Sequence, residues 1–319
     1  MDVLSHLIDA LDVRGRLDLR CEFGDAWTAD HGELTAGNTP YHIVISGQCL
    51  LEMPGGAGHR RLNTGDILVL PRGSAHVLRN VDDAQHKELP APVQQRDDGP
   101  VRVKRNVPGN EHPDVEILCG FFEFNAERNS FLIDSLPDYF VVPTGSGPEL
   151  ENLRALVQLM SHEALRPRIG AQAIINELST ALFAMVLRAY LETQVLPSGA
   201  LALLTSTPMR SALQAMLDDP ARDWKVSDLA SLAHMSRATF ARAFTRLSGA
   251  TPVAMLTQLR MERAVLLLRR GRATVAAVAE QVGYKSEAAF NRAFTRHAGV
   301  GPGSYRRENV SPDTTSRAE

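Results

Sequence analysis

The sequence predicts an α+β protein, with an N-terminal half of short strands that closes into a barrel and a C-terminal third that is helical throughout. Short alternating runs broken by glycine fill residues 40–82, as is typical of strands and turns. A helical unit occurs twice between residues 226 and 302. Residues 224–307 carry 14 Lys and Arg against 4 Asp and Glu, whereas residues 1–223 carry 19 against 30. A basic end on an acidic body indicates that the helical part meets a polyanion.

The composition is that of a globular chain of two or three domains. The 319 residues are 44% hydrophobic and 22% charged. No apolar run reaches the roughly 18 residues of a membrane span, and the first residues do not resemble a secretory signal. We therefore expect a cytoplasmic protein without a membrane partner. Three scattered cysteines and no CxxC pair argue against a disulfide scaffold and against a structural zinc site built on cysteine.

The barrel is expected within residues 1–145. Its strands and turns lie in YHIVISGQCLLEMP and HRRLNTGDILVLPRGSAHVLRNVD. The spacing of five residues between 65 and 80 is more specific than the alternation of apolar and polar residues in the strands. It reproduces the second motif of the cupin fold, in Gly65, Pro71, Gly73, His76 and Asn80. We therefore predict a cupin-like sensor barrel.

The first cupin motif is not intact. His42 stands in YHIVISG, but no HxH precedes it. A metalloenzyme of this fold needs about three to four ligands to hold its ion, and His42 with His76 falls short of that number. We expect no cofactor, no catalytic metal and no enzymatic activity. The two histidines are then either structural or an opportunistic or sensory metal site.

The middle of the chain joins the barrel to the helical third. Residues 84–114 are rich in Gln, Asp, Pro, Lys and Arg and predict a mobile loop. EILCGFFEF (116–124) then predicts a buried strand. Two helical patterns occupy residues 146–195, and the second is apolar on more than one face, which indicates either a homodimer interface or packing within the chain. A linker is expected at residues 196–206.

The basic third contains a duplicated unit, which begins at Val226 and again at Val275. The aligned pairs include Phe240 with Phe290, Phe244 with Phe294 and Pro252 with Pro302. In each copy the two phenylalanines lie four residues apart and mark one buried helix face. Each copy predicts a helix, a tight turn and a second helix.

Local signals support this pattern. Ser236 and Ser286 each offer a hydroxyl to cap the second helix of its copy, and Gly283 suits the turn of the second copy. Residues 252–270 predict one long helix between the copies. Two short helices joined in this way form a helix-turn-helix, whose second helix can enter the major groove of DNA. A helical repeat that binds only protein is the alternative.

The second helix of each copy presents polar and small side chains opposite its phenylalanines. They are Arg237, Ala238, Ala241, Arg242, Thr245 and Arg246 in the first copy and Glu287, Ala288, Asn291, Arg292, Thr295 and Arg296 in the second. Arginine can bond guanine O6 and N7 in bidentate fashion, and other arginines can hold phosphates. These residues are the candidate DNA contacts.

With these motifs, residues 207–307 resemble the DNA-binding domain of the AraC/XylS family of transcription regulators. The second repeat together with GPGSYRR carries most of the likeness. The resemblance implies a seven-helix domain with recognition helices in successive major grooves, and it implies promoter DNA and RNA polymerase as partners. By position it assigns base contacts to Ala238, Ala241, Arg242, Ala288 and Arg292. The tail 308–319 is expected to be disordered.

The N-terminal half resembles the reactive-chlorine-responsive regulators of the RclR type within that family. The likeness lies in MDVLSHL, Cys21, LEMP (51–54), LVLPRGSAHVL (68–78), LCG (118–120) and FLIDSLPDYFVVP (131–143). The resemblance implies that Cys21 and Cys119 sense oxidants such as hypochlorous acid. The neighbouring Arg20 is expected to favour the Cys21 thiolate. Cys119 is expected to be the less exposed of the pair, and Cys49 is interpreted as a packing residue.

The sequence therefore predicts a sequence-specific transcription regulator, an activator, that is gated by cysteine oxidation. One alternative is a regulator gated by a small ligand or metal in the barrel. Another is a cupin enzyme with a helical appendage, which the broken first motif and the duplicated helix-turn-helix argue against.

Overall fold

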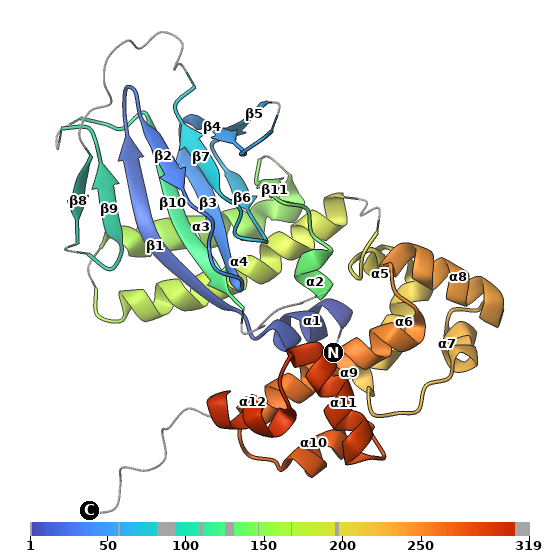
Figure 1. The fold of residues 1–319 in the computed structure, drawn as a ribbon. Coiled ribbons are helices and arrows are strands. Elements are labelled where there is room, and N and C mark those ends of the chain that lie inside the picture. Colours follow the sequence, from blue (N-terminus) through green and yellow to red (C-terminus); the bar gives the residue numbers. More distant parts are fainter. Residues whose placement is uncertain are drawn as a thin grey trace, which may run out of the picture. The chain divides into compact units, whose positions relative to one another are not determined.

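The computed structural model describes residues 2–56, 58–81, 93–97, 99–108, 111–124, 131–145, 147–166, 168–194 and 198–309. The chain forms two compact units. One is Leu11–Gln194, and the other combines Met1–Ala10 with Val195–Glu319. The first ten residues thus belong with the helical unit, although the sequence suggested a barrel domain from residue 1. The predicted α+β class is confirmed (Figure 1).

Two sheets form the N-terminal unit. The larger has the order β11-β6-β3-β10-β1-β9-β8, and the smaller has the order β2-β7-β4-β5. The strands are β1 (Arg14–Phe23), β2 (Thr28–His31), β3 (Asn38–Ser46), β4 (Gln48–Glu52), β5 (His59–Asn63), β6 (Asp66–Val69), β7 (His76–Arg79), β8 (Gln94–Arg96), β9 (Arg102–Arg105), β10 (Val115–Glu123) and β11 (Phe140–Pro143). As EILCGFFEF predicted, β10 is a buried strand, and it lies between β1 and β3. A core cluster between the sheets includes Cys21, Cys49 and Cys119.

Residues 84–114, which we call the insertion, differ from their prediction as a loop. The described residues of the insertion include the strands β8 and β9, and β9 pairs in parallel with β1. Residues 84–92, 98, 109 and 110 lie outside the described residues. The insertion therefore adds two strands to the edge of the larger sheet, beside the strand that carries Cys21.

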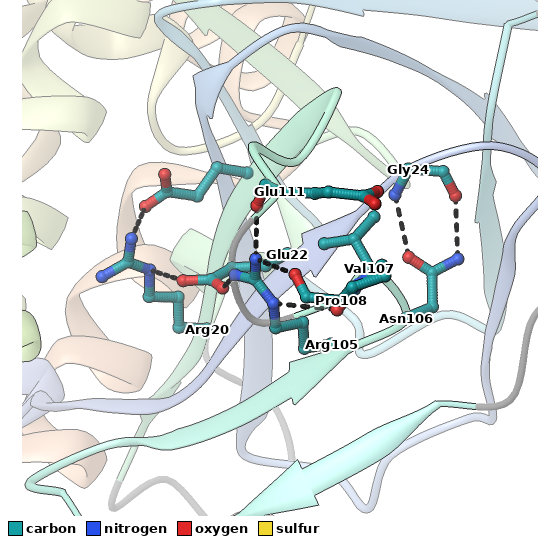
Figure 2. Close-up of polar contacts among 9 residues, drawn as sticks. Arg20, Glu22, Gly24, Arg105, Asn106, Val107, Pro108 and Glu111 are labelled. Carbon is teal, nitrogen blue, oxygen red and sulfur yellow. Dashed lines mark hydrogen bonds and ion pairs between the residues drawn. The ribbon is translucent and has the colours of Figure 1, made fainter.

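Figure 2 shows the polar contacts that fix this edge to β1. Arg105 binds the Glu22 carboxylate and donates to the backbone carbonyls of Val107, Pro108 and Glu111. The Asn106 side chain exchanges two 2.8 Å hydrogen bonds with the backbone of Gly24. These contacts tie the end of β9 to the end of β1.

The helices of the N-terminal unit are α2 (Phe131–Asp134), the 3₁₀ helix η1 (Pro148–Leu150), α3 (Glu151–Leu165) and α4 (Ala171–Thr193). Helix α1 (Val3–Leu11) belongs, except for its last residue, to the helical unit. The long helix α4 packs on β1, where a Cβ on Gly15 would lie 2.2 Å from the Ser179 carbonyl carbon. Only glycine permits so close an approach of the two backbones.

Helix α4 is long and apolar enough to cross a membrane by length and composition, with a mean hydropathy of 1.3. Its apolar residues have partners in the same unit, however. Phe183 packs edge-to-face on Phe122, and Tyr190 lies over Phe140 at 4.3 Å between ring centroids. Packing within the chain thus buries part of the apolar surface of α4, whereas Ile174 near its start is exposed.

The C-terminal unit is helical. Its helices are α5 (Ala202–Thr205), α6 (Thr207–Asp218), α7 (Val226–Leu232), α8 (Arg237–Ser248), α9 (Pro252–Arg269), α10 (Val275–Gln281), α11 (Glu287–Ala298) and α12 (Pro302–Asn309). Residues 200–203, expected in the linker, are buried here because they are apolar and α5 packs on α6 and α8. Residues 308–309, expected in the tail, belong to α12, and residues 310–319 lie outside the described residues.

Both helix-turn-helix units form as the duplication predicted. The Ser236 hydroxyl accepts from the Thr239 amide, and the Ser286 hydroxyl accepts from the Ala289 amide, so both caps are present. The turn of the second copy contains Gly283 at φ +83°, and His234 occupies the same position of the first copy at φ +54°. Helix α9 packs against α8 and α11, so it joins the two recognition helices within one unit.

Candidate functional site

Cys21 and Cys119, the pair that the family resemblance named, lie on the neighbouring strands β1 and β10. In this antiparallel pair Leu19 is opposite Cys119 and Cys21 is opposite Ile117. Cys21 and Cys119 are therefore diagonal neighbours on one face, and both belong to the core cluster between the sheets. Both are free and buried. Cys119 is 7% exposed and Cys21 4%, so the expectation that Cys119 is the less exposed is wrong: both side chains point into the core.

Arg20 does not act on the thiols as the sequence suggested. It lies on the opposite face of β1, where its Nη2 is 2.6 Å from Glu116 Oε1 and its Nε is 3.1 Å from Glu22 Oε1. The cation nearest in register is Lys104, which β9 places opposite Cys21. Its ammonium charge opposes the rise in the pKa of Cys119. The insertion thus supplies the positive charge that we had assigned to Arg20.

The third cysteine lies apart from this pair along the chain. Cys49 is on β4 in the smaller sheet and is fully buried. Burial raises the pKa of its thiol to about 12. Because a neutral thiol is a poor nucleophile, Cys49 has the properties of a packing residue.

An imidazole adjoins the thiol pair. His42 on β3 is directly opposite Cys119 on β10, and its Nδ1 lies 3.1 Å from the Cys119 Sγ. Its other nitrogen, Nε2, lies 2.8 Å from Nε2 of His76. The two histidines named from the sequence are thus brought together, and one of them contacts a named cysteine.

A third histidine completes the cluster. His31 on β2 is directly opposite His76 on β7, and their rings stack with centroids 4.6 Å apart. The ligand nitrogens of His31, His42 and His76 all lie within 4.8 Å of one another. Sequence reasoning missed His31 because only the β2–β7 register places it beside His76. Its position at the end of an alternating run was the one available signal.

Burial keeps these imidazoles neutral. It lowers the pKa of His31 to about 4 and that of His42 well below the usual value, and it also lowers the pKa of His76. The hydrogen bond to Cys21, followed by burial, raises the pKa of the Cys119 thiol well above its usual value. At neutral pH the pocket thus holds uncharged rings beside a protonated thiol.

The hydrogen bonds fix the tautomers. His76 Nδ1 lies 2.9 Å from the Ser74 carbonyl, which only accepts, so Nδ1 carries the proton and Nε2 of the neutral ring is an acceptor. His42 must then donate from Nε2, which leaves its Nδ1 as an acceptor for the Cys119 S–H. A path for a proton therefore runs from Cys119 through His42 to His76.

The candidate DNA contacts lie on α8 and α11. The exposed ones are Arg237, Ala238, Arg242, Arg246, Glu287, Ala288, Arg292, Thr295 and Arg296, and the half-buried ones are Ala241, Thr245 and Asn291. On α11 an open concavity is lined by Asn291, Arg292, Thr295 and Arg296. The phenylalanines of both helices are fully buried, so each helix turns its polar side outward.

Known proteins share both parts of the chain. Residues 2–192 match the cupin family, and residues 229–308 match a helix-turn-helix domain. An "uncharacterized HTH-type transcriptional regulator" of Haemophilus influenzae is 31% identical over 307 residues, which are 96% of this chain and 99% of the relative. The "RCS-specific HTH-type transcriptional activator RclR" of Escherichia coli K12 is 31% identical over 307 residues, which are 96% of this chain and 97% of RclR.

Among solved structures, the DNA-binding domain of AdpA, determined with a target DNA, is 33% identical. The match covers 32% of this chain and 91% of that domain, with a TM-score of 0.31. Both relatives are named transcription regulators, and the matches span nearly the whole of each chain. The chain therefore belongs to the AraC family of transcription regulators, with an N-terminal cupin domain and a C-terminal helix-turn-helix domain that binds DNA.

Proposed function

We propose that this regulator is switched by oxidation of Cys21 and Cys119 to a disulfide. The diagonal placement of the two free cysteines in one core cluster carries the proposal, because buried cysteines that are neighbours across a strand pair can form a bridge without unfolding the domain. The name of the E. coli relative, an RCS-specific activator, supports a reactive chlorine species as the oxidant.

The chemistry needs one oxidant molecule per switch. Hypochlorous acid converts the Cys21 thiol to a sulfenic acid and releases HCl. The Cys119 sulfur then attacks the Cys21 sulfur, a disulfide forms, and water leaves. Two thiols lose two electrons in total, and the chlorine atom gains them. Cys119 is assigned as the resolving cysteine because the raised pKa of its thiol disfavours the thiolate that would react first with the oxidant.

Oxidation strains the sheet because the thiols are diagonal neighbours. In such a pair the Cα atoms lie about 7–8 Å apart, whereas a disulfide holds them about 4.4–6.8 Å apart. Closing the bridge therefore draws β1 toward β10 by roughly an ångström or more. The bulge between Leu17 and Leu19, where the β1 register shifts, is the part of the strand best able to absorb this movement.

The strain has a direct covalent route to the DNA-binding unit. β1 follows α1 after Asp12 and Val13, and the first ten residues belong to the helical unit. There His6 Nε2 lies 2.8 Å from Asp218 Oδ1. Helix α1 also lines a pocket of about 290 Å³ with residues of α6 and α9. A displaced β1 would pull on α1 and so change the unit that binds the operator.

On the DNA side, the proposal gives base contacts to Arg242 and Arg292 and methyl contacts to Ala238, Ala241 and Ala288. The remaining candidate residues would contact phosphates or water. The partners are double-stranded promoter DNA and RNA polymerase in the cytoplasm, where the oxidised form activates transcription. The +10 charge of residues 224–307 supports binding to a polyanion.

The exposed surface of α3 and of the start of α4 suits a homodimer interface, whereas the buried faces of α4 do not, because they are covered within the same unit. Leu159 and Leu165 of α3 and Ile169 and Ile174 near the start of α4 are exposed, and Ile169 is fully exposed. Exposed apolar side chains that are close in the chain favour an interface. The proposed dimer therefore forms through α3 and the start of α4.

The test compares single-cysteine variants in a promoter assay. Cys21→Ser and Cys119→Ser should each abolish induction by hypochlorous acid and leave the DNA affinity of the reduced protein unchanged. Cys49→Ser is the matched control, because it removes a buried thiol of the same core cluster. Full induction in Cys21→Ser or Cys119→Ser would refute the thiol switch.

A further inference from the structure

We propose that His31, His42 and His76 form a zinc site inside the cupin barrel. The three rings come from both sheets of the unit, since β2 and β7 belong to the smaller sheet and β3 to the larger. A bound ion would join the sheets at their centre. This site does not depend on the thiol switch.

The ligand atoms already converge. Nε2 of His42 and Nε2 of His76 are 2.8 Å apart, and all three ligand nitrogens lie within 4.8 Å of one another. A tetrahedral zinc ion with Zn–N bonds of about 2.0–2.1 Å requires nitrogens roughly 3.3–3.4 Å apart. Rotations of the three side chains by about an ångström at the nitrogen would satisfy that geometry.

Backbone carbonyls orient two of the three imidazole rings. His31 Nδ1 lies 3.1 Å from the Ala29 carbonyl, and His76 Nδ1 lies 2.9 Å from the Ser74 carbonyl. Each carbonyl fixes a proton on Nδ1 and leaves the Nε2 lone pair directed into the cluster. Histidine ligands of metal sites characteristically donate their second nitrogen in this way, which orients the ring and fixes its tautomer.

The three imidazole donors restrict which metal ions the site would bind. Three imidazoles without a carboxylate favour zinc, copper, iron or nickel over magnesium or calcium. The Cys119 sulfur contacts His42 at Nδ1, on the opposite side of the ring from Nε2, so it is not placed as a fourth ligand. The fourth position would be left to water or a small anion, as in zinc sites with three histidines.

The site could not be predicted from the sequence, because the sequence lacks the first cupin motif. His76 belongs to the second motif, but His31 and His42 do not form an HxH pair. His31 and His76 become neighbours through the β2–β7 register, and His42 joins them from the other sheet. This separation of the ligands along the chain explains why two histidines alone looked insufficient.

The experiment titrates zinc into full-length protein that has been stripped by a chelator, with calorimetry as the readout. We expect one ion per chain, and His31→Gln, His42→Gln and His76→Gln should each weaken binding at least about 100-fold. His59→Gln is the control, because His59 is an exposed histidine of the same unit that contacts Glu52. Zinc binding that survives all three cluster substitutions, or no binding by the unaltered protein, would overturn the proposal.

Cobalt substitution of the unaltered protein tests the donor set without relying on any variant. The absorption spectrum should show a four-coordinate ion without sulfur-to-cobalt charge transfer. A charge-transfer band would overturn the all-imidazole assignment. Cys21→Ser, which leaves the contact between His42 and Cys119 in place, should bind zinc as the unaltered protein does, so that loss of the thiol switch and loss of the metal site give different results.

Discussion

At the scale of single residues, the candidate functional side chains of the regulator are of two kinds. The thiols and imidazoles of the barrel are buried and interact with one another, whereas the arginines of α8 and α11 are exposed. The buried groups owe their protonation states to desolvation and so depend on the intact core. The exposed arginines have no such dependence and are free to meet DNA.

Arg292 gives the first residue-scale prediction. If it reads a guanine, Arg292→Ala should weaken binding to the operator by about 1–3 kcal/mol and leave binding to unrelated DNA much less affected. Fluorescence anisotropy with both DNAs at one salt concentration measures the difference. An equal loss on all sequences would instead make Arg292 a phosphate contact.

Lys104 gives the second residue-scale prediction. It lies opposite Cys21 in register, and its charge acts on the Cys119 thiol. Lys104→Gln should therefore slow disulfide formation by hypochlorous acid, because a positive charge favours the reactive thiolate. The rate is followed by trapping free thiols at timed intervals. Arg102→Gln, two residues away on the same strand and paired with Asp18, should leave the rate unchanged.

The sequence named Cys21 and Cys119 but not the residues that surround them. Cys21 and Cys119 were assigned from a family resemblance, and the β1–β10 register brings them together. His31 and Lys104 were not assigned, because each joins the site through strand pairings between residues far apart in the chain. Arg20 was misassigned because adjacent residues of a strand point to opposite faces.

At the scale of elements, periodicity predicted the helices well. The cap serines, the phenylalanine spacing and the long helix α9 follow from local rules, and all are present. Residues 84–114 were harder to predict. Their polar composition indicated a loop, yet β9 gains its stability from pairing with β1 and from Arg105, which binds Glu22 and three carbonyls. Composition alone does not reveal such tertiary partners.

The two turns of the helix-turn-helix units differ in a testable way. A Cβ on Gly283 would lie 2.4 Å from the Ala221 carbonyl oxygen, at a φ of +83°. Gly283→Ala should therefore lower the free energy of unfolding of the helical unit by about 1–3 kcal/mol. His234 has a positive φ in the first copy, which glycine adopts without strain. His234→Gly should therefore raise the free energy of unfolding of the helical unit by a few tenths to about 1 kcal/mol.

Urea unfolding reports on this unit alone when only one tryptophan remains. Trp224 lies in the helical unit and Trp27 in the barrel, so both variants are made in a Trp27→Phe background. Unchanged stability in Gly283→Ala would contradict the close approach of the turn to Ala221.

At the scale of the whole molecule, strain in β1 must reach the DNA-binding unit through α1 for the proposed switch to work. His6→Glu would place a carboxylate beside Asp218 and should reduce induction by hypochlorous acid several-fold, because like charges would separate α1 from α6. The disulfide should still form at its normal rate. Adding Asp218→Lys should restore induction by restoring the attraction.

Promoter assays with thiol mapping measure both steps in the same samples. His162→Ala, which changes an exposed histidine on α3, controls for the loss of a surface imidazole. Normal induction in His6→Glu would show that the signal takes another route.

The most direct test of the central claim maps disulfides during activation. The full-length protein is treated with increasing, substoichiometric hypochlorous acid, and each sample is divided between peptide mapping without reduction and transcription in vitro. We predict that one crosslinked peptide pair, containing Cys21 and Cys119, grows in proportion to promoter activation while Cys49 stays free. Activation that precedes this crosslink, or that occurs with both thiols still free, would contradict the account.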